Sequence, residues 1–334
     1  MAPMDGVTDA AFRRIVARHH GPDITFTEFV TVDGIFACMQ GKVSAEKVLD
    51  GLIYGEDEHP IVAQVFGASP EKFYAVAPFL CELGFDGIDI NMGCPERVIV
   101  KSGSGAALMD NPRLAGEIVS VLKKGIADWA SGKLSINDFP ENMKAYVKKG
   151  SELKERKEVP VSVKTRIGTK SNTINEWARY LAEMDLANVS LHGRTLKQMY
   201  EGKADWDAIA EGAKIIKESS ASVLGNGDIK SVQDGQEKAE KYGLDGVLVG
   251  RAIMGNPLFF SGREPSAREK LTLALEHAKC YEEILGHKRF VNMRKHLIWY
   301  ASGFQDASEV RSRLMKVDNA KDCEMIINEA IDRL

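Results

Sequence analysis

The stretch Phe-Asp-Gly-Ile-Asp-Ile-Asn-Met-Gly-Cys-Pro, residues 85–95, decides the fold class. Residues 85–90 form a hydrophobic run with acidic punctuation, which predicts a buried strand. The run breaks abruptly at Gly93, Cys94 and Pro95. A side chain on a turn that follows a parallel strand lies where α/β proteins place their chemistry. For Cys94 considered alone, the alternative is a small buried thiol that fills the turn.

Short apolar runs rich in β-branched residues recur along the chain, separated by stretches with helical periodicity. Strand and helix alternate eight times, which predicts a closed (β/α)8 TIM barrel. An open doubly wound sheet is the alternative, and it is disfavoured because no GxGxxG follows the first strand. The predicted strands are residues 1–4, 23–28, 61–66, 87–91, 161–165, 188–192, 222–225 and 246–250. Helical patterns cover residues 8–19, 70–83, 112–124 and 176–184.

Two stretches depart from this alternation. Residues 126–158 form a polar, Lys-rich insertion, for which we expect a short helix and a loop on the outside of the barrel. From residue 263 onward the strand signal stops, and amphipathic helical patterns cover 268–285 and 309–320. We therefore expect a barrel over 1–260 and a separate all-helical domain over 261–334.

Composition narrows the class of protein. The 334 residues carry a formal net charge of -4, so any nucleic acid must bind to a local basic face. The five cysteines are scattered without a CxxC pair, which suggests neither a zinc site nor a disulfide framework and fits a reducing cytosol. No apolar run approaches the roughly 18 residues that a membrane span needs. We expect a monomeric, cytoplasmic protein that uses neither metal nor membrane.

Two glycine turns end the seventh and eighth predicted strands. Gly225-Asn226-Gly227-Asp228 ends the seventh, and Gly250-Arg251 ends the eighth. Glycine lets backbone N–H groups approach a phosphate closely, and the loops after strands seven and eight are the usual phosphate grip of a TIM barrel. Each turn alone could be an ordinary loop, whereas the two together with Arg251 predict phosphate binding.

Two polar side chains on other strands fit an electron-rich ring. Lys164 lies in an otherwise apolar or small run, and lysine is rarely buried without a partner. Beside a phosphate site, such a cation can neutralise a reduced flavin. Gln64 offers both a donor and an acceptor, which suits the pyrimidine edge of a flavin. The alternatives are a surface lysine and a polar plug in the barrel mouth.

These motifs, in this order over nearly the whole chain, resemble the tRNA-dihydrouridine synthases, FMN enzymes that reduce uridine in tRNA. The family usually carries residues before the first strand, whereas here that strand starts at Met1, as a shortened start or a brief strand would produce. Asp5 stands where a small residue is common, and the insertion is not general to the family. The resemblance rests on APMDGVTD (2–9), QVFG (64–67), NMGCP (91–95), VKTR (163–166), HGRT (192–195), GNGD (225–228), DGV and GR (245–251), GNP (255–257) and MRKH with Trp299-Tyr300 (293–300).

The resemblance implies a mechanism. Reduced FMN, regenerated by NADPH or NADH, supplies a hydride to C6 of uracil, Cys94 supplies the proton to C5, and Asn91 helps to position the base. A proton donor must be a neutral thiol, and an unperturbed cysteine pKa of about 8.5 provides one at neutral pH. The residues implied to hold FMN are Pro3, Met4, Asp5, Gln64, Lys164, His192, Asn226, Gly227, Asp228, Gly250 and Arg251.

The tRNA partner needs a basic surface. No acidic residue occurs from 287 to 305, so the C-terminal helices are expected to present a positive face, with a solvated helix face as the alternative. The expected contacts are Arg97, Lys101, Arg166, Arg194, Lys288, Arg289, Arg294 and Lys295.

Two other functions stay open. A flavin barrel like dihydroorotate dehydrogenase, acting on a free pyrimidine, would not need the basic helical domain. A tRNA-binding protein with a vestigial flavin site is disfavoured, because Gln64, Cys94, Lys164 and Arg251 are all present.

Overall fold

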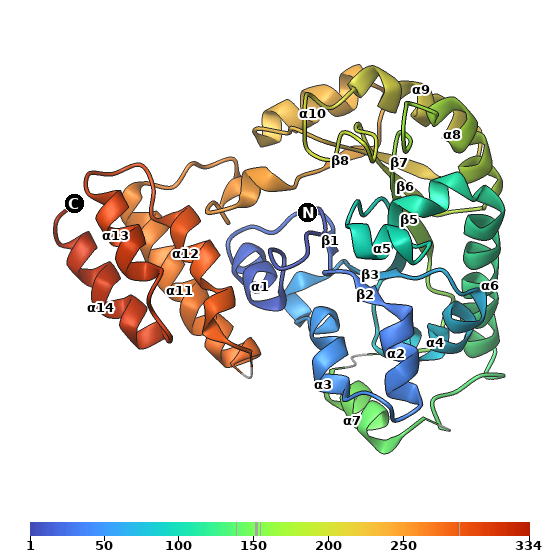
Figure 1. Ribbon diagram of the computed structural model, residues 1–334, viewed down its shortest axis with the longest axis horizontal. Coiled ribbons are helices and arrows are strands. Elements are labelled where there is room, and N and C mark those ends of the chain that lie inside the picture. Colours follow the sequence, from blue (N-terminus) through green and yellow to red (C-terminus); the bar gives the residue numbers. More distant parts are fainter. Residues whose placement is uncertain (138, 151–152, 154, 287) are drawn as a thin grey trace.

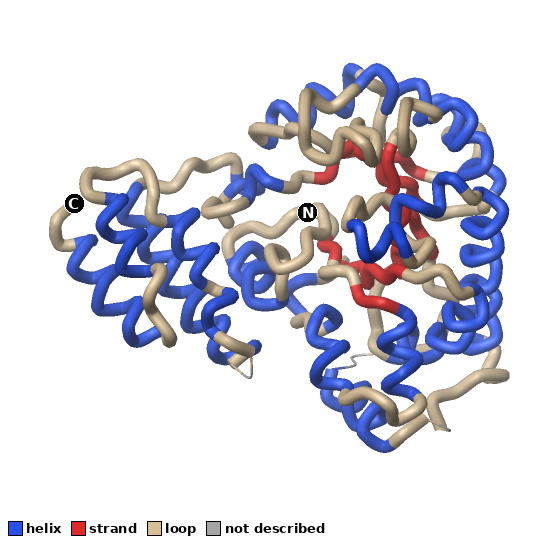
Figure 2. Tube along the Cα trace, in the orientation of Figure 1, coloured by secondary structure: helices blue, strands red, loops and turns tan. Residues whose placement is uncertain are grey.

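The computed structural model describes residues 1–137, 139–150, 153, 155–286 and 288–334. At its centre lies one parallel sheet in the order β1-β3-β4-β5-β6-β7-β8, with β2 also paired to β3. Figure 2 shows the strands enclosed by helices. The strands are β1 (Thr25–Phe26), β2 (Val30–Thr31), β3 (Ile61–Phe66), β4 (Gly87–Met92), β5 (Val161–Arg166), β6 (Asn188–His192), β7 (Ser222–Asn226) and β8 (Gly246–Leu248).

The first residues of the chain bridge the two edges of the sheet. The Ala2 N–H donates to the Val249 carbonyl at 2.8 Å, just after β8. The Met1 ammonium donates to the Ile24 carbonyl at 2.7 Å, just before β1. Residues 1–4 therefore occupy the place of the predicted first strand and close the (β/α)8 barrel. The prediction that they form a strand is wrong, because these two bonds tie single residues to each edge without a ladder.

Helices surround the barrel and continue beyond it (Figure 1). Those of the barrel are α1 (Ala10–Arg18), α2 (Val32–Met39), α3 (Ala45–Val48), α4 (Pro70–Glu82), α5 (Arg97–Lys101), α6 (Pro112–Ala130), α7 (Glu141–Gly150), α8 (Ile174–Glu183), α9 (Trp206–Ile216) and α10 (Val232–Lys241). Those that follow are α11 (Ala267–Leu285), α12 (Arg294–Tyr300), α13 (Ala307–Leu314) and α14 (Ala320–Ile331).

The insertion at 126–158 contributes to the barrel's core. Helix α6 continues to Ala130, and α7 buries Met143 and Val147 in the same apolar cluster as the barrel strands. The Tyr146 hydroxyl donates to the Leu49 carbonyl at 2.8 Å. Residues 138, 151, 152 and 154 of the insertion lie outside the described residues.

The C-terminal helices have their own apolar cluster, which Ala11 and Ile15 of α1 join. Helix α1 lies between the barrel and the C-terminal helices, where it packs against α11 (Figure 1). The predicted single helix over 309–320 is wrong, since α13 ends at Leu314 and α14 begins at Ala320. The reason is a helix cap: the Asn319 side chain accepts the Asp322 N–H at 2.8 Å and starts a new helix.

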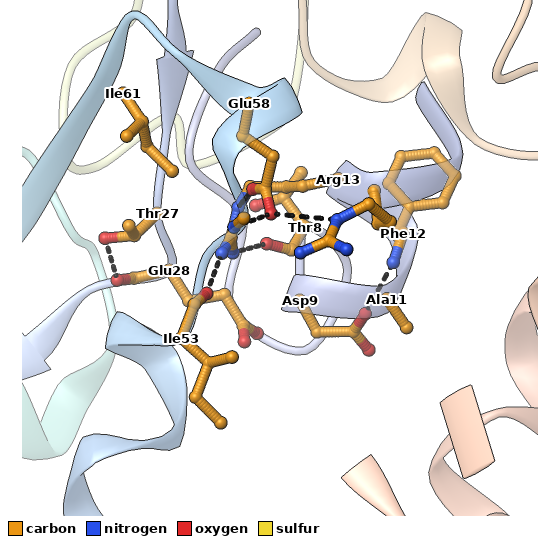
Figure 3. A network of polar contacts seen from close by, with 12 residues as sticks. Thr8, Asp9, Ala11, Phe12, Arg13, Thr27, Glu28, Ile53, Glu58 and Ile61 are labelled. Atoms are coloured by element: carbon orange, nitrogen blue, oxygen red, sulfur yellow. Dashed lines mark hydrogen bonds and ion pairs between the residues drawn. The ribbon is translucent and has the colours of Figure 1, made fainter. Parts of the chain in front are cut away.

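A buried ion pair anchors α1 to the barrel. Figure 3 shows the Arg13 guanidinium facing the Glu58 carboxylate, with Nε 2.7 Å from Oε2. Arg13 also donates to the carbonyls of Thr8 and Ile53, so its buried charge is surrounded by acceptors. The start of α1 is set by Asp9, which caps it by accepting the Phe12 N–H at 2.9 Å.

Candidate functional site

The carboxyl ends of adjacent strands bring predicted site residues to one rim of the barrel. The register pairs Asn91 of β4 with Lys164 of β5, and Arg166 of β5 with His192 of β6. It then pairs His192 with Asn226 of β7. Residues that are far apart in the sequence thus become neighbours at the end of a TIM barrel where active sites form.

The turn that carries Cys94 is held by its own neighbours. Asn91 Oδ1 accepts the N–H groups of Gly93, at 3.1 Å, and of Cys94, at 2.8 Å. The Cys94 carbonyl accepts the Ala106 N–H at 3.1 Å. Gly105 has φ of +59°, and a Cβ there would lie 3.0 Å from the Cys94 oxygen, so glycine permits this close approach. These contacts fix the backbone position from which the Cys94 side chain projects.

The thiol of Cys94 is set apart from the other cysteines. Cys94 is half-buried, whereas the other four are buried. Burial raises the pKa of the Cys94 thiol, and the Glu96 backbone N–H and the Arg166 charge offset only part of that rise. The thiol is therefore neutral at physiological pH, as a general acid requires and a nucleophile does not.

Positive charge is concentrated at this rim, where Arg166 and Arg194 are buried and Lys164 is half-buried. The Lys164 ammonium donates to Asn226 Oδ1 at 3.2 Å. Burial, followed by repulsion from Arg166, lowers the pKa of Lys164 to about 8. Burial and then Lys164, Arg166, Arg194 and Arg251 lower the pKa of His192, so its imidazole is neutral. Such a site favours an anionic ligand, which would relieve the repulsion among these cations.

At the ends of β7 and β8, Asp228 holds two arginines. Arg194 Nη2 donates to both of its carboxylate oxygens, at 2.7 and 3.0 Å, and Arg251 Nη2 donates to Oδ1 at 2.8 Å. The Arg194 side chain is 2% exposed, while that of Arg251 is 54% exposed. Gly227 has φ of +134°, and a Cβ there would lie 2.5 Å from the Ala204 Cβ. Asp228 therefore orients Arg251 toward solvent at the predicted phosphate grip.

The N-terminal loop lies beside this grip. The Met4 N–H donates to Thr8 Oγ1 at 2.9 Å, and a Cβ on Gly250 would lie 3.5 Å from Met4 Sδ. The Gly6 N–H donates to the buried Glu28 carboxylate at 2.5 Å. Burial, with repulsion from nearby acids, raises the pKa of Glu28 to about 7. Pro3 is partly buried and Asp5 is exposed on the same loop.

Several residues predicted to touch tRNA have partners within the protein. Arg166 is 4% exposed and donates to the carbonyls of Gly93, at 2.7 Å, and Met199, at 3.1 Å. Arg194 is held by Asp228 as described above. Lys288 pairs with Asp50 and Arg294 with Asp318. Lys295 is half-buried, and its Nζ lies against Gly6, 2.6 Å from where a Cβ there would be. The exposed residues of the predicted set are Arg97, Lys101 and Arg289.

Two features of the site were not singled out by the sequence pattern. Asp89 is fully buried on β4 and accepts from Gln64 Nε2 at 2.7 Å. Tyr200 is 59% exposed in the turn that Arg166 binds through Met199. An acidic residue inside an apolar strand was a signal for the first. Nothing in the local sequence marks the second, because its place depends on the long-range bond from Arg166.

Metal ligands and membrane-spanning helices are the two other features considered for this chain. Among the described residues, no three His, Cys, Asp or Glu side chains are grouped so that they could hold a metal ion. In the same part of the chain, no helix has the length and apolar character needed to cross a membrane.

Comparison with known proteins gives matches over nearly the whole chain. The family model described as "Dihydrouridine synthase (Dus)" matches residues 1–145 and 139–333. A probable tRNA-dihydrouridine synthase of Staphylococcus aureus (strain Mu50) is 34% identical over 340 residues, covering 98% of this chain and 92% of that protein. The probable tRNA-dihydrouridine synthase 2 of Bacillus subtilis (strain 168) is 32% identical with the same coverage. Morphinone reductase aligns at 12% identity over 81% of this chain and 88% of its own, with a TM-score of 0.48, too distant to bear on function.

Proposed function

Because this chain belongs to the dihydrouridine synthase family, we propose that it reduces the C5=C6 bond of a uridine in tRNA to 5,6-dihydrouridine. The observation that carries the proposal is the neutral, half-buried thiol of Cys94 at the same rim as the positive charges of Lys164, Arg166, Arg194 and Arg251. That pairing suits an oxidoreductase that protonates one carbon of a double bond and holds an anionic cofactor.

FMN fits the residues at this rim. The half-buried Lys164 ammonium has three hydrogens and, among the described residues, one hydrogen-bond partner, so it can serve an electron-rich ring. Arg251 is exposed and oriented by Asp228, next to the glycine turn at Gly227, as a phosphate requires. When bound, FMN supplies the hydride for C6 of the uracil and is reduced again by NADPH or NADH.

The remaining residues of the proposed FMN site act on its ring or neighbourhood. Gln64 is buried next to the rim and would contact the pyrimidine edge of the ring. The neutral His192 adds no charge to the cations around it. Residues proposed to line the rest of the cofactor are Pro3, Met4, Asp5, Asn226 and Gly250.

Cys94 is the proposed proton donor. Its Sγ–H bond breaks as the proton passes to C5 of the base, and the thiolate that remains is stabilised by the nearby Arg166 charge. Since the target base is stacked in folded tRNA, it must be turned out into the barrel mouth to reach this thiol.

We further propose that the chain divides near residue 260 into a barrel and a helical tRNA-binding domain. Two separate apolar clusters support this division. Exposed Arg97 and Lys101 on α5, beside the Cys94 turn, and exposed Arg289 before α12 would contact the RNA backbone.

A substrate comparison tests the proposed function. The purified protein, with FMN and NADPH, is given either tRNA that lacks dihydrouridine or free uridine and orotate. We expect product only from tRNA, identified by mass spectrometry of its nucleosides. Reduction of free pyrimidines at an equal or higher rate would favour the enzyme class of dihydroorotate dehydrogenase instead.

The phosphate grip predicts a loss of FMN affinity in Arg251→Leu. Charge-assisted hydrogen bonds contribute about 1.5–3 kcal/mol, so the Kd for FMN should rise about 10- to 100-fold. Quenching of flavin fluorescence on titration of the apoprotein measures this Kd. Arg263→Leu is the matched control, since Arg263 is 62% exposed and pairs with Glu269 away from the grip. Equal affinities in both variants would exclude Arg251 from the grip.

The proposed RNA contacts predict a change in salt dependence. Arg97→Gln and Arg289→Gln should each weaken tRNA binding and reduce the slope of log K against log salt by about 1. The control is Lys217→Gln, because Lys217 follows α9 at the opposite end of the barrel and pairs with Asp245. Filter binding at several salt concentrations gives the slopes. Slopes that stay unchanged in the two arginine variants would place the RNA elsewhere.

A further inference from the structure

A chain of buried hydrogen bonds runs through the barrel beneath the rim. It begins at Asp89, which is fully buried in the middle of β4. Ser162 Oγ on β5 donates to Asp89 Oδ1 at 2.6 Å. Gln64 Nε2 on β3 donates to Asp89 Oδ2 at 2.7 Å. The carboxylate thus links the two strands that flank its own.

The chain continues from Gln64 to the Cys94 turn. Gln64 Oε1 accepts from Asn91 Nδ2 at 2.9 Å. Asn91 Oδ1 then accepts the backbone N–H groups of Gly93 and Cys94. Gln64 and Asn91 are both buried, so each amide has few alternatives to these partners.

The carboxylate decides the direction of every bond in the chain. A carboxylate only accepts hydrogen bonds, whereas a carboxamide can present either its oxygen or its NH₂ group to a neighbour. Asp89 therefore requires Gln64 to turn Nε2 inward and Oε1 toward Asn91. Asn91 must then turn Nδ2 toward Gln64, which leaves its oxygen for the two N–H groups of the turn. If Asn91 were reversed, its NH₂ group would face two backbone donors.

We propose that Asp89 is a positioning residue for Cys94, acting through Gln64 and Asn91 to hold the turn that presents the thiol. Its meaning for catalysis rests on the proposed role of Cys94, while the effect on the turn does not. Burial raises the pKa of Asp89 to about 6, and the bonds from Ser162 and Gln64 oppose that rise. Asp89 is thus ionised at pH 7.5, where it accepts from both.

Reversing the chain tests this role. In Asp89→Asn alone, the new NH₂ group can donate to Ser162, so the original direction can persist. Adding Ser162→Ala removes that acceptor and favours donation to Gln64 instead, which reverses Gln64 and Asn91. We expect iodoacetamide to alkylate Cys94 of the double variant at least tenfold faster than Cys94 of the native protein. The two rates are compared at the high-pH plateau of the pH profile, where the thiol is fully ionised. Ser162→Ala alone should stay within twofold of the native rate.

A third substitution should restore the turn. Adding Gln64→Glu to the double variant places a carboxylate one link further along, where it again only accepts from Asn91 Nδ2. We expect alkylation of Cys94 to return to within twofold of the native rate. Comparing plateaus, rather than rates at one pH, separates the position of the thiol from its pKa. Because the other four cysteines are buried, the label reports on Cys94.

The alkylation rates decide the proposal without tRNA or flavin, so failure of the proposed function would leave them interpretable. A folded double variant with the native rate would overturn it, as would a triple variant with the fast rate. If the double variant does not fold, hydrogen–deuterium exchange of residues 92–96 in Gln64→Leu gives the second test. Faster exchange than in the native protein is expected there, and native protection would overturn the proposal.

Discussion

Replacing Cys94 by alanine is expected to reduce dihydrouridine formation about 10²- to 10⁴-fold, the usual contribution of a general acid. The variant loses the Sγ proton that the C5 carbon needs. FMN binding and reduction of the bound FMN by NADPH should stay at native levels, because the phosphate grip and Lys164 lie on other strands. Nucleoside mass spectrometry gives the product rate, and flavin absorbance gives the other two.

Two controls define the role of the thiol. Cys94→Ser replaces the thiol by a hydroxyl of similar size that is a weaker acid, so its activity should also fall by at least 10²-fold. Cys81→Ala, which removes a buried thiol on α4, should leave turnover within a few-fold of native. Native product rates in Cys94→Ala would assign the proton to another group.

The second large effect concerns stability. Glu58→Gln should lower the free energy of unfolding by about 3–5 kcal/mol, because it leaves the Arg13 charge buried without its partner. Both side chains are fully buried in the native protein, and their carboxylate and guanidinium face each other (Figure 3). Urea denaturation followed by tryptophan fluorescence measures the loss.

An exposed pair gives the matched control for this substitution. Glu324→Gln breaks the ion pair between Glu324, which is 41% exposed, and Lys279, which is 54% exposed. This substitution should lower the free energy of unfolding by less than about 1 kcal/mol. Equal losses in the two variants would show that the Arg13 charge reaches water. The Arg13–Glu58 pair is also connected to the N-terminal loop at the rim. Arg13 Nη1 donates to the Thr8 carbonyl, and the Thr8 hydroxyl accepts the Met4 N–H.

Much of the barrel could be predicted from the sequence. Short runs that contain apolar residues and alternate with helical patterns predict buried parallel strands, and for residues 61–66 and 188–192 the predicted bounds are those of β3 and β6. The prediction of a first strand at residues 1–4 is wrong, because only two hydrogen bonds, from Met1 and Ala2 to carbonyls distant in the sequence, join this segment to the sheet. The two-residue strand β2 is too short to give a periodic pattern.

The site was less predictable than the fold. The motifs named the residues that the strand ends bring together, and the family match confirms the resemblance on which their roles were based. The motifs could not show that Arg166 and Arg194 donate hydrogen bonds to backbone carbonyls and to Asp228, because those acceptors come from other loops. The motifs also give Asp89 no role beyond that of an acidic residue within a strand. Its hydrogen bonds to Gln64 on β3 and Ser162 on β5 show its place in the structure, and the bond from Gln64 leads on to the Cys94 turn.

The most direct test of the proposed function is a single turnover without oxygen. The protein with FMN reduced by NADPH is freed of excess nicotinamide and mixed with tRNA that lacks dihydrouridine. We predict that the flavin is reoxidised and that one uridine gains the mass of two hydrogen atoms for each flavin oxidised. Reoxidation without that mass gain, or a flavin that stays reduced in the presence of tRNA, would contradict the proposal.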